Sequence, residues 1–227
     1  MAKAETSTER PGRGRPQLRS DEETRGIIYD AARHEFAASG YAATGMEAVA
    51  RRAGVSTRTL YRLIPNKASL FEGMVSDRLE RALANVDLQA IDHAEIEPAL
   101  HAALMACADL TLDEEVIALQ RMVLQETGAS SDIAGVFYRN GIERTTVALA
   151  DWLRAQMKRG LIELDDAEEA AGMLLGMVAS APRRAAMFGN LALPSRPQIE
   201  ARVRNCAALF LRGCQRTRKS PRPSLSE

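Results

Sequence analysis

The chain has 227 residues, 46% hydrophobic and 4% aromatic, and it lacks long runs of Val, Ile and Thr, which favours an all-α fold over a strand-rich one. The formal net charge of 0 hides an asymmetry, because residues 10–67 hold eleven Arg or Lys against six Asp or Glu, and the remainder is correspondingly acidic. A basic module on an acidic body is typical of a DNA-binding protein with a second domain, and the longest nearly uncharged apolar run, 170–182, is too short to span a bilayer.

Residues 1–19 are expected to form a disordered basic arm. Arg13 and Arg15 belong to the run RPGRGRP at 10–16, which resembles the core of an AT-hook. A Gly-spaced Arg pair of this kind can lie along a narrow A·T minor groove. The alternative is a generic basic tail, and Arg13 and Arg15 are candidate DNA contacts.

The first predicted helix begins at a capping box formed by Ser20 and Glu23. It is expected to run to about Ser39 and to end at Gly40, because glycine ends a helix at little conformational cost.

Residues 44–67 predict two short helices joined by a tight turn. Thr44 and Glu47 have the spacing of a second capping box, and Gly54 is expected to end this helix. Ser56 is a good N-cap for the next helix, which should run from Thr57 to about Leu63.

No acidic residue occurs between Ala48 and Phe71. A helix that enters a DNA major groove needs this pattern, because short polar side chains and Arg reach bases and phosphates whereas acids are repelled. The bland alternative is a solvated basic helix. The candidate DNA contacts in and around these helices are Thr44, Ser56, Thr57, Arg58, Thr59, Tyr61, Arg62 and Lys67.

The same stretch resembles the signature of the TetR family of transcriptional regulators, carried here by Gly54-Val55-Ser56, Leu60-Tyr61 and Lys67. The match covers roughly residues 20–75. Leu63 and Ile64 depart from the family pattern, which has an aromatic residue and Phe there, and Leu63 is left out of the site. The resemblance implies a three-helix DNA-binding domain (20–67), a helical ligand-binding and dimerisation domain (68–216) and a disordered tail (217–227).

The body is expected to be helical throughout. Asn66 should cap a helix that extends to about Val86 and links the two domains. Two further helices are predicted to begin at Pro98 and at Asp113–Glu115, and a short one carries Phe137 and Tyr138. Three more are predicted from about Ile142 to Arg159, from Ala167 to Ala181 before Pro182, and from about Pro197 to Arg216.

Two expectations concern this body. Met and aromatic side chains give adaptable apolar walls, so a pocket for an unknown small-molecule effector is predicted at Met105, Met122, Phe137, Tyr138, Trp152 and Met177. Ordinary core packing is the alternative for each of them.

The helix after Asp166 is apolar nearly all round, which predicts burial against a second subunit or, alternatively, inside a monomer core. TetR relatives pair through their last two helices, so a homodimer interface is expected at Gly172, Leu175, Gly176, Val203 and Phe210.

Catalysis is disfavoured. Only His34, His93 and His101 occur, with no metal-ligand spacing, phosphate loop or nucleophile motif, so no metal and no cofactor are expected. The cysteines make no CxxC pair and fit free thiols in a cytoplasmic protein, inert or, alternatively, redox-sensing. The leading hypothesis is a ligand-released repressor that binds a near-palindromic double-stranded DNA operator; the alternative is an architectural A·T-rich DNA-binding protein without a ligand.

Overall fold

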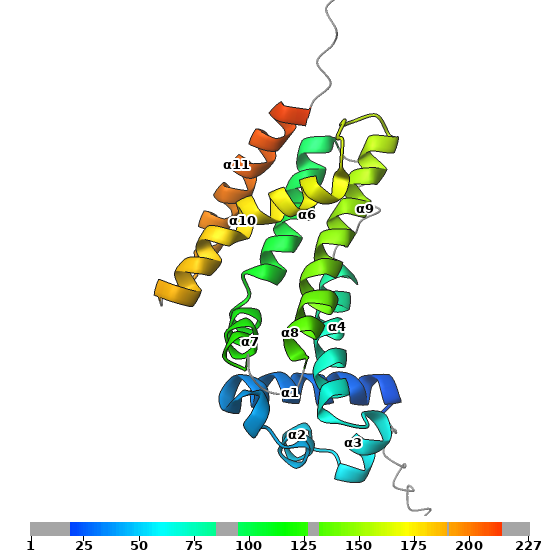
Figure 1. Ribbon diagram of the computed structural model, residues 1–227. Coiled ribbons are helices and arrows are strands. Elements are labelled where there is room, and N and C mark those ends of the chain that lie inside the picture. Colours follow the sequence, from blue (N-terminus) through cyan, green and yellow to red (C-terminus); the bar gives the residue numbers. More distant parts are fainter. Residues whose placement is uncertain (1–18, 85–94, 127–131, 190, 215–227) are drawn as a thin grey trace, which may run out of the picture.

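The computed structural model describes residues 19–84, 95–126, 132–189 and 191–214, and every secondary-structure element in these ranges is a helix, which confirms the all-α prediction (Figure 1). The elements are α1 (Asp21–Ala43), α2 (Met46–Ala53), α3 (Thr57–Leu63), α4 (Lys67–Ala84), α6 (Ile96–Thr111), α7 (Glu114–Gln125), α8 (Ile133–Phe137), η1 (Tyr138–Glu143), α9 (Arg144–Lys158), α10 (Ala167–Gly189) and α11 (Arg196–Cys214).

Local capping signals place the first three helices. The Ser20–Glu23 capping box is present, and the predicted stop at Gly40 has a positive φ of 79°. Gly54 ends α2 in the left-handed conformation, and the hydroxyl of Ser56 accepts a hydrogen bond from the Thr59 amide at 3.0 Å. These contacts set α2 and α3 at a tight turn, as the sequence predicts.

One N-cap prediction is wrong. Gly45, not Thr44, occupies the N-cap of α2 and makes no side-chain cap, so the Thr44–Glu47 capping box does not form. The Thr44 hydroxyl instead donates to the carbonyls of Glu35 and Gly40, at 3.1 and 2.7 Å. Thr44 therefore finishes the preceding helix.

The helices α1, α2 and α3, called the DNA-proximal unit below, share one hydrophobic core with α4 and part of the body. Phe36, Tyr41 and Phe71 form an aromatic cluster with ring centroids 5.5–5.8 Å apart. The same core continues into α7 and α8 through buried side chains such as Met122 and Phe137. The domain boundary at residue 67 remains a prediction; it falls at the first residue of α4 (Figure 1).

A second core lies among α6, α9, α10 and α11, at the end of the molecule away from α2 and α3 (Figure 1). Its fully buried members include Leu104, Leu153, Leu174 and Val203. The helices α10 and α11 cover one side of this core and form an outer edge of the body.

The prediction that Pro182 ends α10 is wrong, because the helix continues to Gly189. Proline has no N–H, so the carbonyl of Val178, four residues earlier, loses its helical donor. The guanidinium of Arg202 on α11 supplies hydrogen bonds to this carbonyl and to that of Met177. The partner helix thus satisfies the break and lets the helix pass through the proline.

The segment from α8 to α9 is one continuous helical run with a π-helical turn, η1, in its middle. The sequence predicted a short helix followed by a separate long one. Wider turns of this kind often lie beside functional sites, and Gly141 and Ile142 of η1 line the cavity described below.

Candidate DNA interface and cavity

The helix α3 presents a polar face at one end of the molecule. Leu60 is fully buried and anchors it, whereas Thr57, Arg58 and Arg62 are exposed and Tyr61 has 45% of its surface exposed. Thr59 is half-buried, and its hydroxyl lies 2.8 Å from that of Ser56. Most of the predicted contact residues of α3 therefore share one accessible surface.

Arg62 is already engaged in the free protein. Its two terminal nitrogens donate to the two carboxylate oxygens of Asp21 at 2.8 Å each, across the gap between α3 and the start of α1. The hydrogen bond from Arg62 lowers the pKa of the Asp21 carboxyl below its usual range. The pair therefore stays charged at neutral pH and holds Arg62 beside α1.

Lys67 has a structural role at the start of α4. Its ammonium donates to the carbonyls of Tyr41, Ala42 and Thr44 at 2.8, 3.0 and 3.0 Å, and it lies 4.8 Å from the centre of the Tyr41 ring. All three N–H donors of the ammonium are used in this way. Lys67 ties α4 to the end of α1, and its role as a DNA contact stays a prediction.

Three further candidate contacts are either buried or outside the described residues. The side chain of Thr44 is only 3% exposed and its hydroxyl serves α1, so it is withdrawn as a DNA contact. Arg13 and Arg15 lie outside the described residues.

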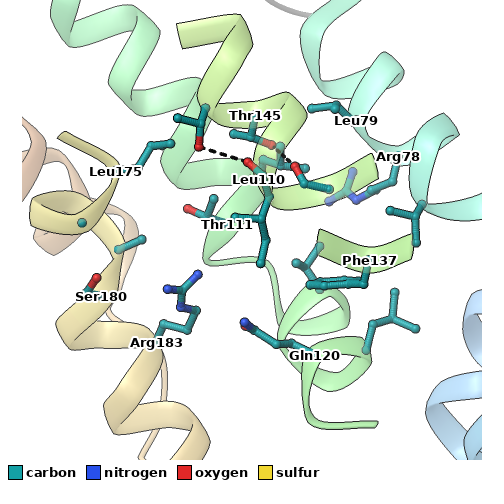
Figure 2. A pocket seen from close by; sticks show the side chains of 18 of the residues that line it. Arg78, Leu79, Leu110, Thr111, Gln120, Phe137, Thr145, Leu175, Ser180 and Arg183 are labelled. Atoms are coloured by element: carbon teal, nitrogen blue, oxygen red, sulfur yellow. Dashed lines mark hydrogen bonds between the residues drawn. The ribbon is translucent and has the colours of Figure 1, made fainter. Parts of the chain in front are cut away.

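A cavity of about 320 Å³ lies between α4 and the helices of the body. Six helices and η1 contribute to its wall, and most of the wall is apolar (Figure 2). The lining residues are Met74, Val75, Arg78, Leu79, Leu110, Thr111, Val116, Leu119, Gln120, Phe137, Gly141, Ile142, Thr145, Thr146, Gly172, Leu175, Gly176, Ala179, Ser180 and Arg183.

Of the six predicted pocket residues, only Phe137 lines this cavity. Tyr138 is 55% exposed, while Met122 is buried in the first core. The remaining three, Met105, Trp152 and Met177, pack in or against the second core. The large side chains were a poor guide because they fill space, whereas the cavity exists where Gly, Thr and Leu leave it open.

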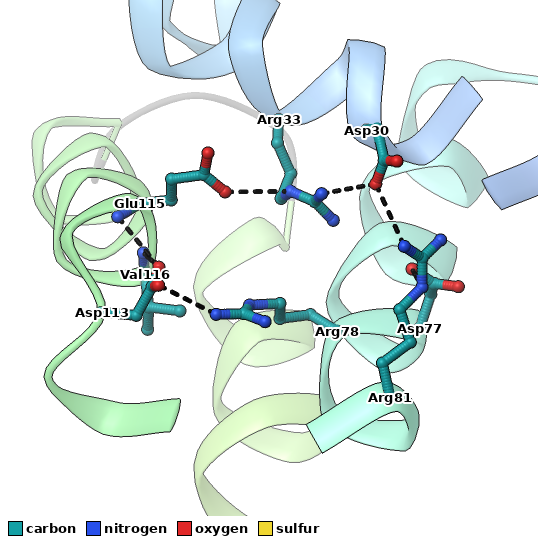
Figure 3. Close-up of polar contacts among 8 residues, drawn as sticks. All are labelled: Asp30, Arg33, Asp77, Arg78, Arg81, Asp113, Glu115 and Val116. Carbon is teal, nitrogen blue, oxygen red and sulfur yellow. Dashed lines mark hydrogen bonds and ion pairs between the residues drawn. The ribbon is translucent and has the colours of Figure 1, made fainter. Parts of the chain in front are cut away.

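Ion pairs between arginines and carboxylates join the helices α1, α4 and α7 (Figure 3). Arg78 of α4 pairs with Asp113 at 2.9 Å, and Arg33 of α1 pairs with Glu115 at 3.2 Å. Arg81 of α4 pairs with Asp77 at 2.9 Å and reaches Asp30 of α1. The helices α1, α4 and α7 are therefore joined by charge as well as by apolar packing.

The residues predicted for a subunit interface lie either in the cavity wall or in the second core. Gly172, Leu175 and Gly176 line the cavity, Phe210 packs against the second core, and Val203 is wholly buried inside the chain, so Val203 is withdrawn. Other apolar side chains of this edge are exposed instead: Met173, Phe188, Leu191 and Leu209, with Phe188 at 82%.

The described residues contain no group of three or more His, Cys, Asp or Glu side chains that could hold a metal ion. Burial raises the pKa of the Cys107 thiol to about 12, which disfavours the reactive thiolate. Among the described helices, none combines the length and apolar character that crossing a membrane requires.

Two family models match this chain, one over the first helices and one over the body. Residues 28–74 match the family model "Bacterial regulatory proteins, tetR family", and residues 98–214 match "AefR-like transcriptional repressor, C-terminal domain". No match was found among curated proteins.

Solved structures resemble most of the chain. A TetR-family regulator from Mesorhizobium loti has a TM-score of 0.74 at 26% identity, covering 87% of this chain and all of the other. The "Flavonoid-responsive Regulator FrrA" has a TM-score of 0.66 at 27% identity, covering 86% of this chain and 98% of its own. A TetR-family regulator from Pseudomonas syringae has 0.61 at 25%, covering 86% and 99%.

Proposed function

Because the chain belongs to the TetR family of bacterial transcriptional regulators, we propose that it is a repressor that binds a near-palindromic operator as a dimer and is released by a small-molecule effector. The observation that carries this proposal is the path of α4. This helix begins at Lys67 against the DNA-proximal unit, and its middle, from Met74 to Leu79, lies in the wall of the cavity.

DNA recognition is assigned to the exposed face of α3. Thr57, Arg58 and Tyr61 point away from the core, and no acidic residue of the helix opposes a phosphate. Polar side chains and arginines at such positions can read base edges or bind the backbone. Arg62 and Ser56 complete the proposed contact surface, and Arg13 and Arg15 remain proposed contacts of the arm.

Dimerisation is assigned to the outer edge formed by α10 and α11. Exposed Met173, Phe188, Leu191 and Leu209 give this edge an apolar character that a second copy of the chain would cover. Gly172 is exposed there too and would allow a close approach of a partner helix. A two-fold pair would place two α3 helices to read successive major grooves about 34–36 Å apart.

The effector response is assigned to contacts that α4 shares with both ends. Met74, Val75 and Leu79 of α4 line the cavity. Leu70 and Phe71, nearer the start of the same helix, pack in the core that α4 shares with α2 and α3. A ligand that shifts α4 would therefore move the DNA-proximal unit. The ligand responsiveness that FrrA carries in its name supports such a role here. Couplings of this kind change DNA affinity by about 5–150-fold.

The test is selection of bound fragments from a pool of genomic or random duplexes by the full-length protein. An enriched inverted repeat with half-site centres about 10–10.5 base pairs apart would support the proposal. Enrichment of A·T-rich tracts without dyad symmetry would instead support the alternative, an architectural DNA-binding protein.

A further inference from the structure

The polar groups in the wall of the cavity are not equivalent, because several already form hydrogen bonds or ion pairs within the protein. The hydroxyls of Thr111, Thr145 and Thr146 donate to the backbone carbonyls four residues earlier in their own helices. Arg78 is paired with Asp113 at 2.9 Å. The three hydroxyls are therefore satisfied and the charge of Arg78 is paired, although its Nε is buried without a hydrogen-bond partner.

Three other polar residues of the wall differ. Gln120 of α7 and Ser180 and Arg183 of α10 have no hydrogen bond or ion pair with any residue in the described part of the chain. Figure 2 shows Arg183 and Gln120 reaching the cavity from these two helices, with Ser180 on the same helix as Arg183. Apart from the buried Nε of Arg78, the unused donors of the cavity therefore belong to the α7–α10 side.

The α4 side of the wall is apolar apart from the ion-paired Arg78. Met74, Val75 and Leu79 of α4, together with Leu110 and Phe137, present hydrocarbon to the same space. The cavity thus has a hydrocarbon side and a side with an uncompensated positive charge. A guanidinium next to a low-dielectric wall favours an anion strongly, and its forked donors match a carboxylate in a bidentate manner.

We propose that the cavity binds an amphipathic organic carboxylate, with its carboxylate on Arg183 and Gln120 and its hydrocarbon part along α4. This inference rests on the proposed role of the cavity as the effector site. The volume of about 320 Å³ lies at the small end of the range for ligand pockets, so a compact acid fits better than a large conjugate. Binding would bring hydrocarbon against the helix that links the two ends of the protein.

The test uses two acids and their neutral counterparts as probes: octanoate with 1-octanol, and 2-naphthoate with 2-naphthalenemethanol. Calorimetric titration into the full-length protein is expected to show at least one acid binding about tenfold or more tightly than its alcohol, because a charge-assisted hydrogen bond separates the two. Arg183→Gln should abolish this preference and leave alcohol binding unchanged. Arg183→Lys should retain part of it.

Arg184→Gln is the matched control, since Arg184 is the exposed neighbour of Arg183 and does not line the cavity. Unchanged alcohol binding by Arg183→Gln also shows that the variant is folded. Failure of both acids to bind more tightly than their alcohols, or an undiminished preference in Arg183→Gln, would overturn the proposal.

The same samples separate this inference from the proposed function. The ratio of acid to alcohol affinity is measured without DNA, whereas operator binding is measured without a ligand. A preference for acids in a protein that selects no operator would uphold the carboxylate site and reject the repressor. Operator binding with no preference for acids would do the reverse.

Discussion

Arg202 donates to the carbonyl oxygen of Val178 at 2.8 Å, and this is the carbonyl that Pro182 leaves without its helical donor. A side chain of α11 thereby repairs the backbone of α10. The contact explains why α10 passes through a proline, and it joins α10 to α11.

Replacing Arg202 with Met should lower the free energy of unfolding by about 1–3 kcal/mol, since carbonyls would lose charge-assisted donors. Pro182→Ala in the same variant should restore much of the loss, because the new N–H can donate to Val178. Urea denaturation at one fixed protein concentration measures both effects. Arg204→Met, an exposed substitution on α11, is the control. No rescue by Pro182→Ala would contradict this account of the proline.

The Lys67 ammonium binds three carbonyls at the end of α1, which makes the stability of the free protein the relevant measurement. Lys67→Met is expected to cost about 1.5–3 kcal/mol and to lower Tm by about 3–10 °C in the absence of DNA. Lys158→Met, at an exposed position near the end of α9, should leave Tm nearly unchanged. A Lys67→Met protein that melts normally but binds DNA weakly would show instead that Lys67 acts in DNA binding.

In the proposed DNA interface, the ion pair between Asp21 and Arg62 would compete with DNA for the same guanidinium. Asp21→Asn should therefore strengthen operator binding severalfold, because it frees Arg62 and removes a negative charge near the phosphates. Fluorescence anisotropy at fixed salt measures the change. Asp151→Asn, which removes an exposed carboxylate paired with Arg154 on α9, is the matched control. Weaker binding by Asp21→Asn would show that Asp21 positions Arg62 for DNA.

Arg78 both lines the cavity and joins α4 to α7 through Asp113. Arg78→Met is expected to reduce the effect of a bound ligand on DNA affinity, because the rigid connection between the cavity wall and α7 is lost. The ratio of operator affinities with and without octanoate should fall several-fold toward 1. Arg144→Met, which removes another ion pair to α4 outside the cavity wall, should keep the wild-type ratio. An unchanged ratio in Arg78→Met would remove this arginine from the coupling.

The sequence predicted the features that depend on neighbouring residues. The caps at Ser20 and Ser56 and the break in helical geometry at Gly40 are predicted correctly, since each depends on residues within a few positions.

The sequence missed the features that depend on distant partners. The sequence predicts an exposed Thr44 because nothing local shows that carbonyls of α1 accept from its hydroxyl. It predicts a stop at Pro182 because Arg202 becomes a neighbour of this proline only after folding. Arg183 had no local signal, since its position in the cavity depends on how α7 and α10 meet.

The most direct test of the central claim compares wild type with Tyr61→Ala and Arg58→Ala on the selected operator fragment and on a shuffled duplex, by anisotropy at two salt concentrations. The wild-type protein should prefer the operator by about 10³ or more, and each substitution should reduce operator affinity by about 1–3 kcal/mol while the fold is retained. Equal affinity of the wild type for both duplexes, or folded variants that bind as well as the parent, would contradict recognition by α3.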